Sequence, residues 1–120
     1  MRVLIVESDP DLGRIWKKHI ERADCTVDLA GTQEAAIDLL QTQNVAVIIL
    51  DLVLEHGSAF AIADFASYRR PEARVVFVTN TTFFSDGSIF QHIPNVRAFL
   101  QRETPPDDLA AIVEYHGRQA

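Results

Sequence analysis

The sequence is poor in cysteine, in basic residues and in long hydrophobic runs, and each shortage excludes a class of protein. Its single cysteine, Cys25, cannot form an internal disulfide, which fits a reducing, cytoplasmic location. Acidic residues outnumber basic ones by 17 to 11, with no basic stripe, so direct binding of nucleic acid is not expected. The longest apolar run, Val45 to Leu50, is too short to cross a membrane, and the N-terminus shows no signal-peptide pattern.

What the sequence does contain is a series of five short apolar runs with helical patterns between them. A short run without polar alternation is typical of a strand buried on both faces, as in the middle of a parallel sheet. The predicted strands are 2–6, 26–29, 45–51, 74–78 and 96–100, and the predicted helices are 10–23, 32–40, 58–67, 86–92 and one from 105 onwards. We therefore expect residues 1–120 to form one α/β domain, a flavodoxin-like (βα)5 doubly wound parallel sheet with the strand order 2-1-3-4-5.

Capping residues and apolar spacing define the predicted helices. Asp9 before Pro10 suits an N-cap followed by proline at the first helical position, and Thr32 suits the N-cap of the second helix. One face of the first helix is expected to be buried, and it consists of Leu12, Ile15, Trp16, Ile20 and Ala23.

The carboxyl ends of the predicted strands meet at one edge of the sheet, where ligands of open α/β sheets bind. Asp51 ends the most apolar strand, and packing alone does not explain an acid at that position. Strands one and three are neighbours in the predicted order, so Glu7 should lie beside Asp51. The same edge collects Ser8, Asp9, Thr79 and Arg102.

The turn after the first strand favours a cation over a phosphate group. Its sequence, Glu7-Ser8-Asp9-Pro10-Asp11, has three carboxylates and no glycine, whereas a nucleotide or flavin site needs a loop of free amides. Carboxylates from two adjacent strand ends suit Mg²⁺, and a carboxylate beside such a metal can act as a nucleophile toward a phosphoryl group. A flavodoxin-like cofactor carrier or small enzyme is therefore disfavoured, and we do not expect enzymatic activity.

Four segments, in this order and spacing, resemble the receiver domain of two-component response regulators, and the resemblance covers the whole chain. They are Val3 to Asp9, Ile48 to Leu54 with Gly57 to Phe60 after it, Val75 to Thr79, and Ala98 to Arg102. The resemblance implies that Asp51 is the phosphoacceptor. It also implies a Mg²⁺ ion held by Glu7, Asp51 and the backbone carbonyl of Val53, with Ser8 or Asp9 as a further ligand.

The resemblance further implies a switch that is driven by phosphorylation. Thr79 and Arg102 would bind the phosphoryl oxygens, and Phe99 would change rotamer. The phosphoryl donor would be a sensor histidine kinase or a phosphotransfer protein. The altered surface, made by the helix at 86–92, the strand at 96–100 and the last helix, would bind a downstream protein or a second receiver in a homodimer. We expect a stand-alone receiver without an output domain.

Several positions depart from the family pattern, and they favour an alternative. A direct metal-ligand carboxylate is replaced by Ser8, so we expect Mg²⁺ binding to be weakened roughly 10–100-fold. Arg102 stands where the family has lysine, Glu103 and Glu55 stand where it has proline, and Asn80 replaces a small residue. The alternative is a degenerate receiver that acts as a phosphorylation-independent protein-interaction module. An edge closed by Arg102 paired with Asp51 would favour it.

Two adjacent phenylalanines, Phe83 and Phe84, occur in an otherwise polar loop. They cannot both point inward easily, so either one is exposed for a partner or both fold over the edge of the sheet.

Overall fold

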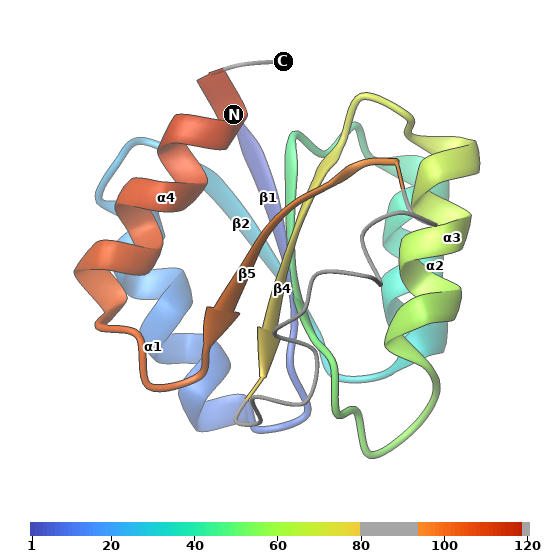
Figure 1. The fold of residues 1–120 in the computed structure, drawn as a ribbon, viewed down its shortest axis with the longest axis horizontal. Coiled ribbons are helices and arrows are strands. Elements are labelled where there is room, and N and C mark those ends of the chain that lie inside the picture. Colours follow the sequence, from blue (N-terminus) through green and yellow to red (C-terminus); the bar gives the residue numbers. More distant parts are fainter. Residues whose placement is uncertain (80–93, 119–120) are drawn as a thin grey trace.

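The computed structural model describes residues 1–79 and 94–118, and it places five parallel strands in one sheet between pairs of helices (Figure 1). The elements are β1 (Arg2–Val6), α1 (Pro10–Glu21), β2 (Thr26–Ala30), α2 (Gln33–Thr42), β3 (Val47–Asp51), α3 (Ala59–Arg69), β4 (Arg74–Thr79), β5 (Val96–Gln101) and α4 (Pro106–Arg118). The strand order is β2-β1-β3-β4-β5, which confirms the predicted order. The helix predicted at 86–92, together with Asn80, Phe83 and Phe84, lies outside the described residues.

The sheet separates two hydrophobic layers. Helices α1 and α4 cover one face and α2 and α3 cover the other (Figure 1). Successive side chains of a strand point to opposite faces, so β4 sends Phe77 into the layer under α2 and α3 and Val76 into the layer under α1 and α4. The central strand β3 is buried along its whole length, as its continuous apolar run predicts.

Polar side chains fix the helix starts, as the sequence predicts. Asp9 is the N-cap of α1 and its side chain accepts hydrogen bonds from the backbone amides of Asp11 and Leu12, with Pro10 at the first helical position. Thr32 caps α2 by accepting from the amide of Ala35 at 3.1 Å. These caps satisfy amides that have no partner within the helix.

Two details of the sequence prediction are wrong. Ile15 was expected on the buried face of α1 but is 47% exposed, whereas Trp16 is 1% exposed. Successive helical residues are about 100° apart, so Ile15 turns away from a buried face that is centred on Trp16 and Ile20. Strand β3 begins at Val47, although Val45 before it is still buried.

Strand β5 contains an irregularity that no pattern in the sequence indicated. Val75 pairs with Val96 and Val76 pairs with Ala98, so the pairing of β4 and β5 skips Arg97. The exposed Arg97 side chain donates to the carbonyl of Pro94 at 2.6 Å. This bulge shifts the alternation of β5, and Phe99 packs against the α2–α3 layer while Leu100 packs against the α1–α4 layer.

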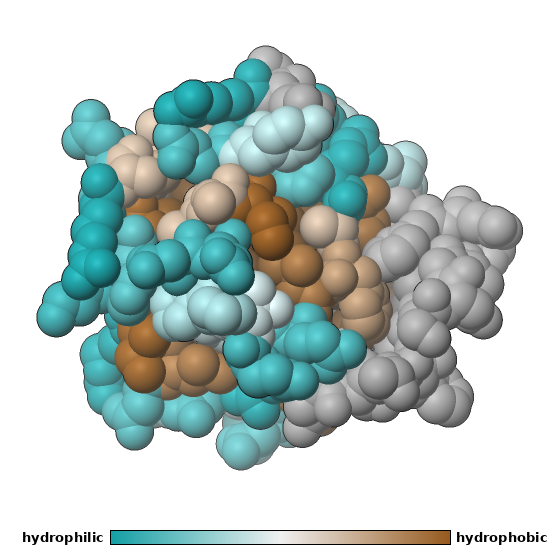
Figure 2. Space-filling view, turned by 60° about the vertical axis from the view of Figure 1, so that its left-hand side comes forward, coloured by the Kyte–Doolittle hydropathy of each residue, from teal (hydrophilic) through white to brown (hydrophobic). Residues whose placement is uncertain are grey.

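The surface on the side of α1 and α4 is mostly hydrophilic, with apolar patches between the polar side chains (Figure 2). Large apolar residues with substantial exposure include Ile15, Val53, Tyr68 and Tyr115. Within residues 1–79 and 94–118, no helix has the length and apolar character needed to cross a membrane.

Candidate functional site

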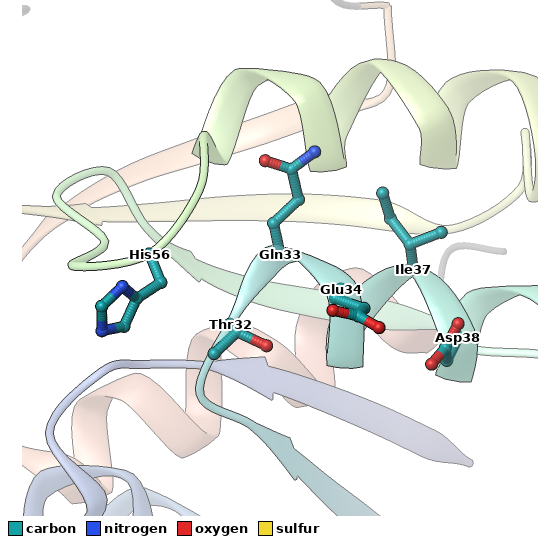
Figure 3. Close-up of a pocket in the computed structure, with 6 residues that line it drawn as sticks. All are labelled: Thr32, Gln33, Glu34, Ile37, Asp38 and His56. Carbon is teal, nitrogen blue, oxygen red and sulfur yellow. The ribbon is translucent and has the colours of Figure 1, made fainter.

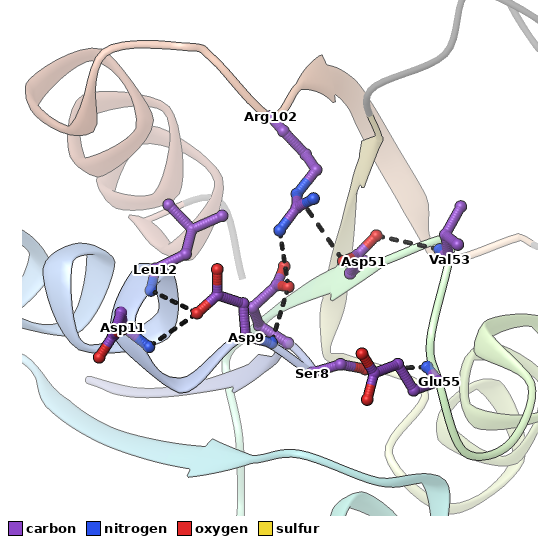
Figure 4. A network of polar contacts seen from close by, with 9 residues as sticks. Ser8, Asp9, Asp11, Leu12, Asp51, Val53, Glu55 and Arg102 are labelled. Atoms are coloured by element: carbon purple, nitrogen blue, oxygen red, sulfur yellow. Dashed lines mark hydrogen bonds and ion pairs between the residues drawn. The ribbon is translucent and has the colours of Figure 1, made fainter.

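A cleft of about 570 Å³ lies at the edge where β1, β3 and β5 end. It is lined by Glu7, Ser8, Asp9, Pro10, Asp51, Val53, Glu55 and Arg102, many of which belong to one network of polar contacts (Figure 4). The structure therefore brings together six of the predicted site residues, which are Glu7, Ser8, Asp9, Asp51, Val53 and Arg102.

The two acids at the centre of the cleft are buried. Val6 pairs with Leu50 in the parallel register, so Glu7 and Asp51 follow matching positions of β1 and β3. Each side chain is only 2% exposed. Two buried carboxylates this close repel each other and lose their hydration, and they are tolerated only where positive charge or hydrogen-bond donors compensate them.

Arg102 supplies that positive charge. Its Nη2 donates to Glu7 Oε1 at 3.0 Å, and its Nε lies 3.9 Å from Asp51 Oδ2, which is within ion-pair range but beyond a hydrogen bond. The backbone amide of Arg102 donates to the carbonyl of Thr79 at 2.8 Å, which fixes the start of the side chain at the end of β4. The guanidinium is thus held mainly by Glu7.

Burial raises the pKa of Glu7 from 4.5 to about 7, and the neighbouring Asp51 carboxylate acts in the same direction. The backbone amide of Asp9, which donates to Glu7 Oε1 at 3.1 Å, and the charge of Arg102 both oppose the increase. Near neutral pH, Glu7 is therefore divided between its protonated and ionised forms.

Ser8 and Asp9 have structural partners in the cleft (Figure 4). Ser8 Oγ accepts a hydrogen bond from the backbone amide of Glu55 at 2.9 Å, and so joins the turn after β1 to the loop after β3. Asp9 Oδ1 caps α1. Ser8 and Asp9 thus serve as a loop link and a helix cap.

The loop after Asp51 is held from two sides. Asp51 Oδ1 accepts from the backbone amide of Val53 at 2.9 Å. On the other side, Gln33 Oε1 accepts from the amide of Ser58 at 2.8 Å, and the amide of Gln33 donates to the carbonyl of His56 at 3.2 Å. Figure 3 shows Gln33 reaching from α2 toward the start of α3, beside a second cleft of about 460 Å³.

Sequence reasoning missed the role of Gln33. A glutamine at the start of a helix carries no signal of a long-range contact. The glycine at position 57 was the signal available in the sequence. In the structure Gly57 has a φ of +108°, and a Cβ atom there would lie 2.3 Å from the Cβ atom of Gln33.

The two predicted switch residues lie on β4 and β5. Thr79 is fully buried at the end of β4, and it is not among the described residues that line the cleft. Phe99 is half-buried against the α2–α3 layer. Their expected movements stay predictions.

The donor set of the cleft suits a hard divalent cation. Glu7 Oε2 is buried and has no hydrogen-bond partner among the described residues, so it can accept a cation. Within the described part of the chain, no three His, Cys, Asp or Glu side chains are grouped to hold a metal ion. Mg²⁺ does not require such a group, because it uses one or two carboxylates and keeps several waters.

Comparison with known proteins decides the family. A family model described as the response regulator receiver domain matches residues 3–114. The chain belongs to the response regulator receiver domain family. No curated protein matches it in sequence.

Solved structures agree with the fold of this receiver domain. A CheY-like receiver domain protein from Methanospirillum hungatei superposes with a TM-score of 0.89 at 18% identity, over 98% of this chain and 94% of the other. The response regulator TrrA from Thermotoga maritima, in complex with Mg²⁺ and BeF, gives 0.82 at 17% identity over 96% and 97%. A Burkholderia pseudomallei response regulator with a phosphorylated aspartic acid and a calcium ion gives 0.83 at 15% identity over 98% and 69%.

Proposed function

We propose that this receiver domain is a phosphorylation-controlled switch, in which Asp51 accepts a phosphoryl group. The observation that carries the proposal is the position of Asp51, a buried carboxylate at the end of the central strand that faces both Glu7 and Arg102. Acids are seldom buried without a role, and here the cleft reaches the acid from solvent.

The chemistry is the transfer of a phosphoryl group from a phosphohistidine or a small phosphodonor. An Asp51 carboxylate oxygen attacks phosphorus, and the bond between phosphorus and the donor's nitrogen or oxygen breaks, so that the leaving group keeps the electron pair. Arg102 would bind the negative oxygens of the transferred group, and its forked donors suit them. The amide of Val53, which donates to Asp51 Oδ1, orients the carboxylate.

A divalent cation would be held by Glu7 and Asp51, with the backbone carbonyl of Val53 as a third ligand. When bound, Mg²⁺ would neutralise charge on the phosphoryl oxygens. Support comes from the orphan Oε2 of Glu7, and from the metal ions in the structures of the Thermotoga and Burkholderia relatives. Ser8 supplies no carboxylate, so the site should bind Mg²⁺ weakly.

The proposed partners follow from this function. The phosphoryl donor would be a sensor histidine kinase or a phosphotransfer protein in the cytoplasm, and the output would be a downstream protein or a homodimer. Half-buried Phe99 within β5 is suited to transmit a change, because its neighbour in the register is the buried Phe77. The domain would act as a phosphoacceptor and not as an enzyme.

The test is intact mass after incubation with acetyl phosphate, with and without Mg²⁺. We expect the wild type to gain one phosphoryl group, Asp51→Asn to gain none, and Asp64→Asn, which changes an exposed acid of α3, to behave as wild type. Circular dichroism should confirm that all three are folded. No gain in folded wild type, with its own kinase as well as with acetyl phosphate, would refute the proposal.

One observation favours a second candidate, the phosphorylation-independent interaction module. Arg102 already pairs with Glu7 and lies near Asp51, so the acids of the cleft are partly neutralised from within. A constitutive module would bind its partner equally well as wild type and as Asp51→Asn, whereas a switch would lose phosphodonor-dependent binding in that variant.

A further inference from the structure

Two buried polar atoms in the cleft lack hydrogen-bond partners among the described residues, and they belong to the two members of one ion pair. They are Glu7 Oε2 and Arg102 Nε. Buried polar groups are normally satisfied, and exceptions point to a ligand or to a second arrangement. Glu7 Oε2 is an acceptor that suits a cation, and Arg102 Nε is a donor that suits an anion.

The distances show which acid holds the guanidinium. Arg102 is 3.0 Å from Glu7 but 3.9 Å from Asp51, so its one short contact is with the proposed metal ligand and not with the proposed phosphoacceptor. The backbone of Arg102 is fixed by its bond to Thr79, but its side chain is 29% exposed. The guanidinium therefore has room to shift between the two acids.

We propose that Glu7 exchanges Arg102 for a divalent cation, and that Arg102 sets the cation affinity of the cleft through this exchange. The inference rests on the proposed function, because it concerns the cation of the same cleft. When Glu7 turns to the cation, Arg102 loses its short contact. Its Nε then finds an acceptor on Asp51 Oδ2, or on oxygens attached there. The position of the Arg102 guanidinium thus depends on the partner of Glu7.

Because Ser8 supplies no carboxylate, cation binding depends more strongly on Glu7. Its Oγ already accepts from the amide of Glu55 at 2.9 Å, and it brings no charge to the cleft. Asp9 and Glu55 also line the cleft, but both are exposed and Asp9 caps α1. The buried carboxylates are Glu7 and Asp51, and both of these face Arg102. Removal of the guanidinium should strengthen cation binding, because a like charge then leaves the site and both oxygens of Glu7 become available.

The first measurement is calorimetric titration of the full chain with MgCl₂ at constant ionic strength. We expect Arg102→Gln to bind Mg²⁺ about tenfold tighter than wild type or more. Arg102→Lys, which keeps the charge but lacks the fork, should lie between them. The matched control is Arg14→Gln, which removes the same charge from the exposed face of α1, where it pairs with Asp11. Its affinity should change less than about twofold.

The second measurement follows the guanidinium itself. In ¹⁵N-labelled wild type, the Nε–H signal of Arg102, assigned by its absence from Arg102→Lys, should shift as Mg²⁺ is added. Wild type that binds no Mg²⁺ beside an Arg102→Gln variant that does would also support the exchange. Equal or weaker binding by folded Arg102→Gln, binding by neither protein, or tightening that Arg14→Gln reproduces would each overturn it. An Nε–H signal that stays unchanged in wild type that does bind Mg²⁺ would also overturn it.

These readouts are independent of phosphoryl transfer. If the exchange occurs but Asp51 gains no phosphoryl group, the proposed function fails and the exchange stands. If Asp51 is phosphorylated but wild type and Arg102→Gln bind Mg²⁺ equally well, the proposed function stands and the exchange fails.

Discussion

Substitution of Glu7 by glutamine should stabilise the protein at alkaline pH and much less at acidic pH. Glu7 has a pKa of about 7 in the folded protein against an ordinary 4.5, so folding favours its protonated form. The contribution of this bound proton to the free energy of unfolding is fully present below about pH 4.5 and is lost as the pH rises to about 7. The two values differ by about 2.5 pH units, which corresponds to about 3 kcal/mol at ~1.4 kcal/mol per unit.

Glu7→Gln imitates the protonated acid at every pH. Its amide oxygen can still accept from Asp9 and Arg102, and its amide nitrogen replaces the buried Oε2 that lacks a partner. Relative to wild type, the free energy of unfolding of this variant should therefore rise by about 2 kcal/mol between pH 5 and pH 8.

The assay is urea denaturation at pH 5, 6, 7 and 8, in buffer that contains EDTA so that no metal contributes. Glu55→Gln is the control, because it makes the same chemical change in an exposed side chain of the same cleft. The difference in free energy of unfolding between Glu55→Gln and wild type should not change with pH. A difference between Glu7→Gln and wild type that does not change with pH would refute the reasoning, and would mean that Glu7 is ionised at little cost in the folded protein.

Three further predictions concern stability. Gly13→Ala should stabilise the protein by about 0.5–1 kcal/mol, because Gly13 lies within α1 and the new methyl group would make only ordinary contacts with Leu29 at 3.5 Å and Glu7 at 3.8 Å. Gly57→Ala should destabilise it by about 2 kcal/mol, because the position has a φ of +108° and the new methyl group would lie 2.3 Å from the Cβ atom of Gln33. Arg70→Gln should cost about 1–2 kcal/mol, since the guanidinium hydrogen-bonds two carbonyls at the end of α2. Denaturation midpoints with equal m-values would check all three.

The two glycine variants serve as controls for each other. A Gly13→Ala variant that is less stable than wild type would show that α1 packs too tightly for the methyl group. A Gly57→Ala variant as stable as wild type would show that the loop relaxes away from Gln33. For Arg70, the exposed Arg14→Gln variant provides the comparison. If both variants lowered the stability equally, the hydrogen bonds from Arg70 to the end of α2 would have no specific role in holding α2 and α3 together.

Much of the fold can be predicted from local patterns. Continuous apolar runs indicate buried parallel strands because both faces of such strands are covered, and the caps at Asp9 and Thr32 act through neighbouring amides. The placement of Glu7 beside Asp51 follows from strand order alone. Apolar character does not by itself indicate burial: Ile15 is apolar, but its angle around α1 puts it outside the buried face.

The contacts within the site could not be predicted in the same way. The contact of Arg102 with Glu7 is 3.0 Å long and its contact with Asp51 is 3.9 Å long, so its choice between them depends on a difference of less than 1 Å. The link from Ser8 to Glu55 joins residues that are 47 positions apart. No spacing in the sequence encodes such contacts, because each depends on where separate loops meet in space.

The bulge at Arg97 decides which face of the sheet each later residue of β5 points to. Each residue after the bulge faces the side opposite to that expected by counting from Val96, so Phe99 and Leu100 owe their layers to one extra residue. Deletion of Arg97 would place Ala98 directly after Val96, as Val76 follows Val75 in β4, so it would remove the bulge and keep Phe99 and Leu100 on their present faces. Loss of a second residue would exchange the two faces of the strand as far as Arg102. During evolution or redesign, β5 can therefore vary or lose the residue at this position, whereas any further change in its length is constrained by both hydrophobic layers and by the cleft.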